Sequence, residues 1–414
     1  MKKEFYDSVK KELVGNILPY WEKYSRDTVN EGFFGDIDND NRQDGDVSRS
    51  IVMTSRFLWA YSSAARLLGD SSLLGMADFA YKVIKEKYID RVNGGVYWSV
   101  RPDGTPDVRK KQIYGEAFCC YGLSEYAAAV REFRGADSCA QEAMDSALAI
   151  FEFLEKYALD PADGGYVEAR AENWAVTDDM LLSKKDMNCP KSMNTNLHVM
   201  EAYTNLHRTL PVVCPERMEE RKSVGKSLAA LIIVTVEKIL QKNGHLGMFF
   251  NMKWNLLDDE ISYGHDIEAS WLLWEAAVEL GDEPLKERIR PTVLYMADVA
   301  LAEGTDSGSG AMENFTKGGK RDRTRIWWNQ AEALNGFYNA WLMTGLKKYA
   351  DACELQWKWI EEHQVDRKGG EWWAAVSPDG KPDLQEPKGG NWKTAYHSAR
   401  ACIVTLESVR DEAK

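Results

Sequence analysis

Hydrophobic and polar positions follow a helical period over most of the chain. Six segments carry apolar residues three and four positions apart, the spacing that predicts amphipathic helices. They span residues 55–68, 116–131, 193–208, 266–280, 330–343 and 396–409. Each neighbours a second amphipathic segment, such as 71–88 or 136–157. The pattern therefore predicts an all-α protein built from helix pairs.

A short glycine–aromatic motif separates the pairs and recurs roughly 60 to 80 residues apart, the spacing of a repeat architecture. Its copies begin at Gly32, Gly94, Gly164, Gly244, Gly310 and Gly369. Two copies continue into turns, at 101–104 and 377–380, that we expect to close short β-hairpins. We predict an (α/α)6 barrel of six helix pairs with short β-hairpins at one end. The same repeat could form an open solenoid, but six copies complete one turn of a closed barrel.

No Pro-, Ser- or Gln-rich linker interrupts this pattern, so we expect residues 1–414 to form a single catalytic domain. Two long polar loops, 171–191 and 304–323, interrupt the helices. Loops of that length inside a compact domain are usually functional. We expect both to form the rim of a cavity between the inner helices.

Composition narrows the possible partners. The chain is 44% hydrophobic and 28% charged, with a formal net charge of -13. Such a surface repels phosphate backbones and anionic membranes, so we expect no nucleic acid or membrane partner. The first 23 residues lack the apolar core of a signal peptide, and no stretch is long and apolar enough to span a bilayer.

Cysteine and aromatic content add two expectations. Seven irregularly placed cysteines without a CxxC pair favour reduced thiols in the cytoplasm over disulfides or a zinc site. Fifteen Trp and eighteen Tyr raise the prospect of a carbohydrate ligand, because aromatic rings stack on sugar faces.

Three of the six histidines lie near the starts of predicted inner helices, namely His198, His265 and His397. A single histidine at such a place is more often structural than catalytic, but the recurrence at equivalent repeat positions favours a shared site. Glu268 follows His265 by three residues, so it lies on the same helical face and could orient the imidazole. His207, His245 and His363 lack polar neighbours in sequence, and we expect them to be surface or structural residues. 

Other polar and aromatic positions face the same predicted cavity. Arg56 stands among apolar residues, although such an arginine can also extend its charge to the surface. Trp328, Glu332 and Asn335 form a stripe along one helix. Tyr114 and Trp392, like Trp328, are candidate platforms for a sugar ring, although core packing is the commoner fate of Trp. The HxxE spacing lacks the second histidine of a zinc-protease helix, so we expect no metal.

Five strings, in chain order, resemble those of cellobiose 2-epimerases, a group within the N-acylglucosamine 2-epimerase superfamily. They are SRFLW at 55–59, PKSMNTNLH at 190–198, YGHDIEA at 263–269, WWNQAE at 327–332 and GNWKTAYH at 390–397. The resemblance covers nearly the whole chain. It implies epimerisation at C2 of the reducing-end glucose of a β-1,4-linked disaccharide, such as cellobiose or lactose, without a cofactor.

The resemblance also implies roles for single residues. His265 and His397 would be the general acid and base on opposite sides of C2, with Glu268 orienting His265. His198 and Arg56 would hold the enediolate oxygens. Substrate contacts would come from Tyr114, Asp186, Asn194, Trp328 and Trp392, and we add Glu332 from its place in the stripe.

Alternatives remain at this point. An aldose–ketose isomerase of the same superfamily would share the enediolate but return the proton to C1. A glycoside hydrolase on the same barrel would need two carboxylates flanking the scissile bond, where the inner helices instead offer histidines. A non-catalytic sugar-binding protein would have no use for opposed imidazoles. We expect a monomer.

Overall fold

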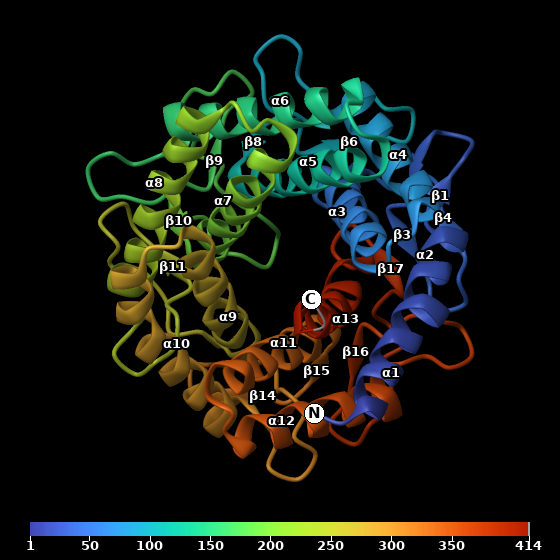
Figure 1. The fold of residues 1–414 in the computed structure, drawn as a ribbon, viewed down its shortest axis with the longest axis vertical. Coiled ribbons are helices and arrows are strands. Elements are labelled where there is room, and N and C mark those ends of the chain that lie inside the picture. Colours follow the sequence, from blue (N-terminus) through green and yellow to red (C-terminus); the bar gives the residue numbers. More distant parts are fainter. Residues whose placement is uncertain (413–414) are drawn as a thin grey trace.

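The computed structural model describes residues 1–412 and confirms a barrel of helix pairs. Figure 1 shows an inner ring of helices enclosed by an outer ring. The inner helices are α3 (Ile51–Leu68), α5 (Ile113–Arg134), α7 (Met193–Val213), α9 (Tyr263–Leu280), α11 (Trp327–Thr344) and α13 (Ala395–Glu412). Each packs against the next, and α13 packs against α3. The ring is therefore closed, and the open solenoid is excluded.

The outer ring supplies one helix to each inner partner. It consists of α1 (Lys3–Glu12) with α2 (Leu18–Tyr24), α4 (Leu74–Val83), α6 (Ser138–Phe153), α8 (Met218–Val234), α10 (Glu283–Gly304) and α12 (Lys347–Trp359). Most of them contain or end in a π-helical turn, at η1 (Leu13–Ile17), η3 (Ile84–Tyr88), η4 (Leu154–Ala158), η5 (Thr235–Ile239) and η6 (Ile360–Gln364). A 3-10 turn, η2 (Ser71–Leu73), precedes α4.

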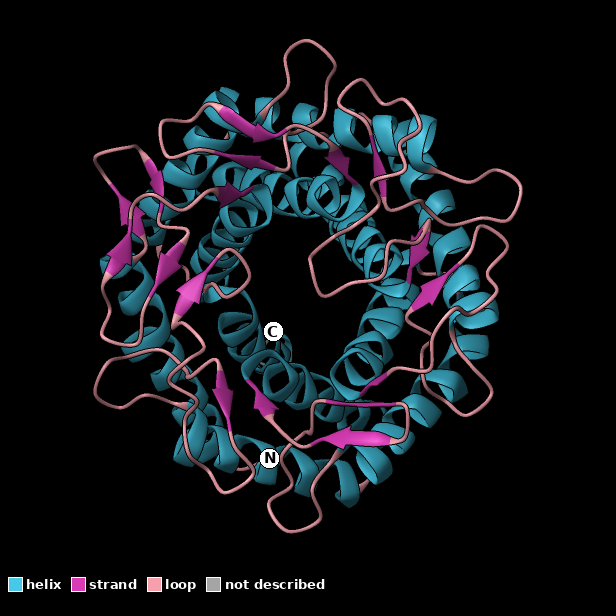
Figure 2. Cartoon of the chain, turned by 180° about the vertical axis from the view of Figure 1, so that it is seen from behind, coloured by secondary structure: helices cyan, strands magenta, loops and turns pink. Residues whose placement is uncertain are grey.

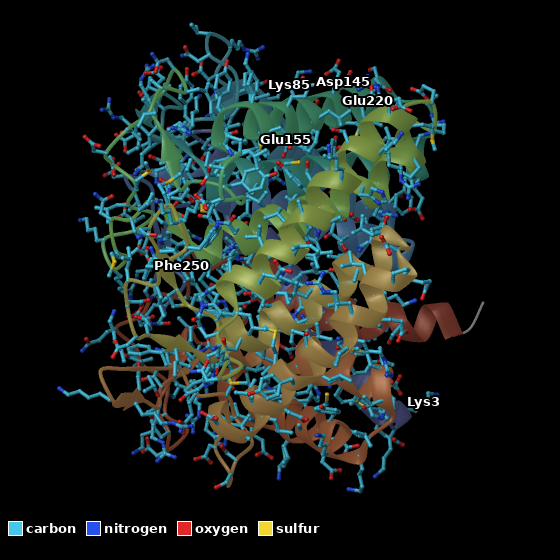
Figure 3. All side chains as sticks on the ribbon, turned by 90° about the vertical axis from the view of Figure 1, so that its left-hand side faces the viewer. Lys3, Lys85, Asp145, Glu155, Glu220 and Phe250 are labelled. Atoms are coloured by element: carbon cyan, nitrogen blue, oxygen red, sulfur yellow. The ribbon has the colours of Figure 1, made fainter. Side chains whose placement is uncertain are left out.

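Short strands gather at one end of the barrel, as Figure 2 shows. They are β1 (Arg26–Asp27), β2 (Gly32–Phe33), β3 (Asp36–Ile37), β4 (Gln43–Asp44), β5 (Arg49–Ser50), β6 (Ser99–Val100), β7 (Pro106–Val108), β8 (Lys111–Gln112), β9 (Ala169–Arg170), β10 (Lys191–Ser192), β11 (Phe249–Phe250), β12 (Ile261–Ser262), β13 (Phe315–Lys317), β14 (Lys320–Asp322), β15 (Arg325–Ile326), β16 (Ala375–Val376) and β17 (Gly389–Gly390). The expected turns at 101–104 and 377–380 are both present. In the side view of Figure 3, Phe250 lies at the strand-bearing end and Lys3 lies towards the other end.

The strand pairs also join neighbouring repeats. The strand before each inner helix pairs antiparallel with a strand of the next repeat, as β5 does with β6 and β8 with β9. The last such pair, β17 with β3, joins the C-terminal repeat to the first one. Closure of the barrel therefore involves backbone hydrogen bonds as well as helix packing.

A buried ion pair holds most of these turns. The Asp90 carboxylate accepts hydrogen bonds from the Val92 and Asn93 amides, and its other oxygen lies 2.8 Å from Lys111 Nζ. The arrangement recurs as Asp27–Arg49, Asp160–Lys191, Asp306–Arg325 and Asp366–Lys388. The fourth repeat has Gln241 and Ile261 at these two positions, so both charges are absent together.

Glycine is required next to this pair for steric reasons. Gly95 has φ +69°, and a Cβ there would lie 2.6 Å from Glu116 Oε1 and from the Trp174 ring. Gly165 repeats this arrangement with φ +71° and a Cβ position 2.4 Å from the Trp254 ring. The glycine–aromatic motif is thus a close backbone approach at the start of the next inner helix.

Two expectations from composition concern the cysteines and the helices that could span a membrane. All seven cysteines, each within the described residues, are unpaired. Within residues 1–412, none of the helices combines the length and apolar character that a membrane crossing needs.

Candidate active site

A cavity of about 350 Å3 opens at the strand-bearing end of the barrel. Its wall includes His265, Asn194 and Asp186 of the sequence-predicted residues. Both long loops contribute to it, the first through Leu182, Lys185, Asp186 and Met187 and the second through Phe315 and Lys317. The expectation that these loops form a rim is therefore confirmed.

Two of the predicted imidazoles approach one indole. The ring centre of Trp328 lies 4.6 Å from that of His265 and 5.9 Å from that of His397. His265 comes from the first turn of α9, Trp328 from the first turn of α11 and His397 from the first turn of α13. Three inner helices thus bring these rings to one place because each begins at the strand-bearing end.

Each of these imidazoles has a different partner at Nδ1. His397 Nδ1 lies 2.7 Å from Glu332 Oε1, and His265 Nδ1 lies 2.7 Å from Ser262 Oγ. An ionised Glu332 carboxylate would only accept, which would place the hydrogen of His397 on Nδ1 and leave Nε2 as the basic nitrogen. Burial lowers the pKa of His265 to about 3 and holds that of His397 well below its usual value. Both rings are therefore neutral at physiological pH.

His198 and Arg56 occupy an adjoining part of the barrel. His198 Nδ1 lies 2.7 Å from Glu201 Oε2, and its ring packs edge-on against Tyr114. Arg56 donates to the Tyr114 hydroxyl at 3.0 Å and to the Trp392 carbonyl at 2.8 Å. The Arg56 guanidinium is buried, yet its Nε–H has no hydrogen-bond partner within residues 1–412.

Arg400 connects the surroundings of His397 with those of His198, and it was not among the residues predicted from the sequence. Its guanidinium contacts Glu201, Glu268 and Glu332, the last at 2.7 Å. Burial together with the neighbouring charge of Glu332 raises the pKa of Glu268 to about 8. Despite burial, Arg400 and His198 hold the pKa of Glu201 down at about 2. One cation therefore lies among three carboxyl groups of different protonation.

The predicted partnership of Glu268 with His265 is wrong. Within residues 1–412 the two side chains form no hydrogen bond, because Arg400 holds the Glu268 carboxyl group and Ser262 holds the His265 ring. The same spacing does join His198 to Glu201, one inner helix earlier. Glu332 was expected to bind substrate, but its carboxylate is occupied by His397, Arg400 and Trp271.

Two histidines set aside on sequence also have polar partners. His245 is buried, with Nδ1 lying 2.7 Å from Asp266 and Nε2 lying 3.3 Å from Glu303. His207 lies 2.7 Å from Glu279. The expectation that they lack polar neighbours was wrong, because their partners come from other helices or turns. Their structural role remains consistent with these contacts.

Of the remaining candidates, Asp186 and Asn194 line the cavity, whereas Trp392 lies beside Arg56. Asp186 bonds to Ser183, and burial raises the pKa of its carboxyl group. The side-chain oxygen Oδ1 of Asn194 is buried without a hydrogen-bond partner within residues 1–412. Trp392 is 39% exposed and packs beside Tyr114 and Trp98 at ring distances of 6.0 and 6.1 Å. Trp98 is the last residue of the glycine–aromatic motif that begins at Gly94, and it was not predicted to contact the substrate.

A cluster of possible metal ligands lies beside the candidate imidazoles. Glu268, Glu332 and His397 each offer an atom within 4.8 Å of the others. The Arg400 guanidinium already contacts both carboxyl groups, and the His397 Nδ1 is bonded to Glu332. These donors are already bonded to Arg400 or to one another, so the cluster does not fit a metal site.

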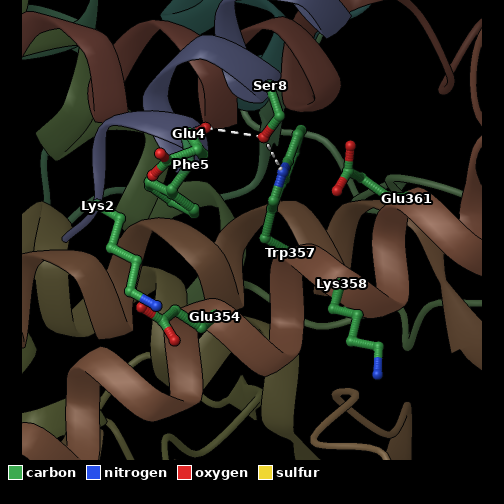
Figure 4. Close-up of a pocket in the computed structure, with 8 residues that line it drawn as sticks. All are labelled: Lys2, Glu4, Phe5, Ser8, Glu354, Trp357, Lys358 and Glu361. Atoms are coloured by element: carbon green, nitrogen blue, oxygen red, sulfur yellow. Dashed lines mark hydrogen bonds between the residues drawn. The ribbon is translucent and has the colours of Figure 1, made fainter.

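A second hollow, of about 290 Å3, lies on the surface between α1 and α12 (Figure 4). It is lined by Lys2, Glu4, Phe5, Ser8, Glu354, Trp357, Lys358 and Glu361. None of the candidate residues takes part in it. Its hydrogen bond from Trp357 Nε1 to Ser8 Oγ, at 2.7 Å, joins the two helices.

Solved structures define the class of this barrel. Cellobiose 2-epimerases from Bacillus thermoamylovorans and Spirochaeta thermophila superpose with a TM-score of 0.89 each, at 34% and 35% identity. The coverage is 98% of this chain and 100% of the first structure, and 100% and 98% for the second. A D-mannose isomerase (TM-score 0.79, 18% identity) and a GH76 α-mannanase (0.64, 11%) share the fold alone.

The particular family follows from sequence. Residues 32–401 match the model of the N-acylglucosamine 2-epimerase (GlcNAc 2-epimerase) family. The cellobiose 2-epimerase of Bacteroides fragilis is 38% identical over 406 residues, covering 96% of this chain and 97% of that protein. That of Dictyoglomus turgidum is 34% identical, covering 99% of each. The chain therefore belongs to the N-acylglucosamine 2-epimerase family and is a carbohydrate epimerase, an isomerase.

Proposed function

We propose that the protein inverts C2 of the reducing-end glucose of β-1,4-linked disaccharides, converting cellobiose to glucosyl-mannose and acting also on lactose. The observation that carries this proposal is the approach of His265, which lines the cavity, and His397 to one indole, that of Trp328. The similarity to cellobiose 2-epimerases over the whole chain supports the substrate class.

The chemistry requires a base on each face of one carbon. In the open-chain aldehyde, one imidazole removes the C2 proton and the electron pair moves into an enediolate. The second imidazole, which carries a proton on the nitrogen facing C2 when the enediolate forms, returns that proton to C2 from the opposite face, and the first imidazole keeps the proton that it removed. Groups with pKa values not far from neutrality suit both steps. Burial lowers the pKa of His265 and of His397 in the empty site, and the negative charge of the enediolate would raise the pKa of the ring that acts as the acid.

Negative charge develops on the enediolate oxygens, and Arg56 and His198 are suited to receive it. The Arg56 guanidinium is buried, carries an unpaired Nε–H and stands beside Tyr114. A preorganised donor in a water-poor site contributes on the order of 3 kcal/mol to such a transition state. Stabilisation by these groups would make a metal or redox cofactor unnecessary, and we propose that none takes part.

Substrate contacts are assigned to the cavity mouth. Trp328 and Trp392 would stack on sugar rings, while Tyr114, Asn194 and Asp186 would bond to hydroxyl groups. The unpaired Asn194 oxygen supports this role, since a sugar hydroxyl would satisfy it. Glu332 would act on His397 rather than on the sugar, because its oxygens are already bonded.

Incubation with cellobiose and separation of the products by sugar chromatography tests the proposal. We expect glucosyl-mannose as the main product. A ketose as sole product would favour an aldose–ketose isomerase, and free glucose would favour a hydrolase. His265→Ala and His397→Ala should abolish turnover while disaccharide binding, followed by calorimetry, persists. Binding without turnover in the wild type would indicate a sugar-binding protein.

Residues 1–414 would act as one catalytic domain and as a monomer. Unpaired cysteines throughout the described residues support a reducing, cytoplasmic location. Size-exclusion chromatography with light scattering would test the monomer, and a dimer mass would contradict it.

A further inference from the structure

Arg400 contacts the two glutamates that hold His198 and His397. It lies on α13 one helical turn after His397 and is buried. Its two terminal nitrogens contact Glu201 of α7, Glu268 of α9 and Glu332 of α11. Tyr396 lies against it and also bonds to Glu201. A single guanidinium therefore ties four of the six inner helices together beside the site.

Two of these carboxylates each hold one imidazole. Glu332 Oε1 lies 2.7 Å from His397 Nδ1, and Glu201 Oε2 lies 2.7 Å from His198 Nδ1. Burial raises the pKa of Glu332, and the charge of Arg400 opposes that rise. Without the guanidinium, a protonated Glu332 would donate to Nδ1 and leave the hydrogen of His397 on Nε2. The ring would then have lost its basic nitrogen.

We infer that Arg400 is a positioning residue: it keeps Glu332 and Glu201 as hydrogen-bond acceptors, so that His397 and His198 carry their hydrogen on Nδ1 and keep Nε2 basic. The inference rests on the proposed function for its effect on turnover. Its effect on the imidazoles is independent of any activity. Arg400 acts through the carboxylates and need not touch the sugar.

Arg400→Lys tests the effect on turnover, since one ammonium cannot bridge three carboxyl groups as a planar guanidinium does. We expect kcat for epimerisation to fall about 10- to 100-fold, as for other residues that orient a catalytic group. KM should change less than about threefold. The acidic limb of the kcat–pH profile should move to higher pH by roughly one unit, because Glu332 then needs a higher pH to ionise.

Arg325→Lys is the matched control. Arg325 is also buried and paired with carboxylates, Glu313 and Asp306, but none of these contacts a candidate imidazole. Lysine stands at the equivalent position in other repeats, as Lys111 and Lys191. This variant should keep the wild-type kcat and pH profile. If Arg400→Lys does not fold, Arg400→Lys/Glu268→Gln replaces it, with one carboxylate fewer facing the cation.

Nitrogen NMR of protein labelled in its six histidines supplies the readout that needs no turnover. In the wild type, His397 and His198 should show a protonated Nδ1 and an unprotonated Nε2. In Arg400→Lys, at least one of these two rings should show a mixture of the two neutral tautomers. A folded Arg400→Lys with the wild-type kcat and pH limb would overturn the inference. So would a wild-type His397 with its hydrogen on Nε2, even if neither variant folds. Failure of the wild type to epimerise any disaccharide would contradict the proposed function instead. The NMR result would still decide the role of Arg400.

Discussion

At the scale of single residues, the partner at Nδ1 distinguishes the imidazoles of the cavity. His397 and His198 are held by carboxylates, whereas His265 is held by the Ser262 hydroxyl. A hydroxyl can donate or accept, so it does not fix the position of the imidazole hydrogen as an ionised carboxylate does. His265 can therefore change between the two neutral tautomers more easily than His397.

Substitution of these partners should have unequal effects. Glu332→Gln removes the charge that fixes His397, and we expect kcat to fall about 10- to 100-fold with little change in KM. Ser262→Ala, the matched change at His265, should cost less than about fivefold, because a water can replace a hydroxyl. Initial rates of epimer formation from cellobiose measure both. A larger loss in Ser262→Ala than in Glu332→Gln would contradict this ranking.

The sequence contained signals for most of this site but misassigned one contact. The HxxE spacing occurs at both His198–Glu201 and His265–Glu268, and only the first pair is bonded. Spacing defines a helical face, but the competing partner Arg400 comes from a helix more than a hundred residues away. Arg400 itself could have been noticed, since it is an arginine on a predicted inner helix, like Arg56.

At the scale of elements, periodicity located the inner helices but placed most of their starts late. Segments predicted to begin at 55, 116, 266 and 330 begin at Ile51, Ile113, Tyr263 and Trp327. In the helices that begin at Ile113, Tyr263 and Trp327, the first turn carries a polar side chain that bonds to the preceding turn, so it departs from the apolar period. These side chains are Glu116, Asp266 and Gln330. Helix caps such as Ser50, which accepts from the Met53 amide, mark the true start.

The turn ion pairs make a testable contribution to stability. Lys111→Met leaves the Asp90 carboxylate buried without its cation, and we expect a loss of about 3–5 kcal/mol of unfolding free energy. Urea denaturation followed by tryptophan fluorescence measures it. Adding Asp90→Asn to Lys111→Met should recover part of the loss, as the uncharged Gln241 and Ile261 of the fourth repeat indicate. A double variant less stable than Lys111→Met would contradict this explanation.

At the scale of the whole molecule, the barrel buries a charge cluster at its centre and so links stability to pH. The pKa of Glu268 is about 8 in the folded protein, above its usual 4.5. Its protonated form stabilises the fold fully below pH 4.5, and this contribution is lost as the pH rises through 8. The lowered pKa of His265 acts oppositely, and its contribution is lost as the pH falls below 6.5.

Comparison with Glu268→Gln isolates the carboxyl group, because the imidazoles are common to both proteins. Between pH 5 and pH 8, without sugar, the unfolding free energy of Glu268→Gln should rise relative to wild type by about 1–3 kcal/mol. Urea unfolding at pH 5, 6.5 and 8 measures the difference. A difference that stays constant, or that falls with pH, would show that Glu268 is ionised throughout.

If His265 and His397 serve opposite faces of C2, exchange of the C2 hydrogen with solvent should separate their two roles. His265→Asn and His397→Asn would each be incubated in D2O with cellobiose and, separately, with glucosyl-mannose, and loss of the C2 hydrogen would be followed by proton NMR. Each variant should exchange the C2 hydrogen of one epimer only, a different one in each variant, without interconverting the two sugars. Epimerisation by either variant, or exchange of the same epimer by both, would contradict this assignment of the two histidines.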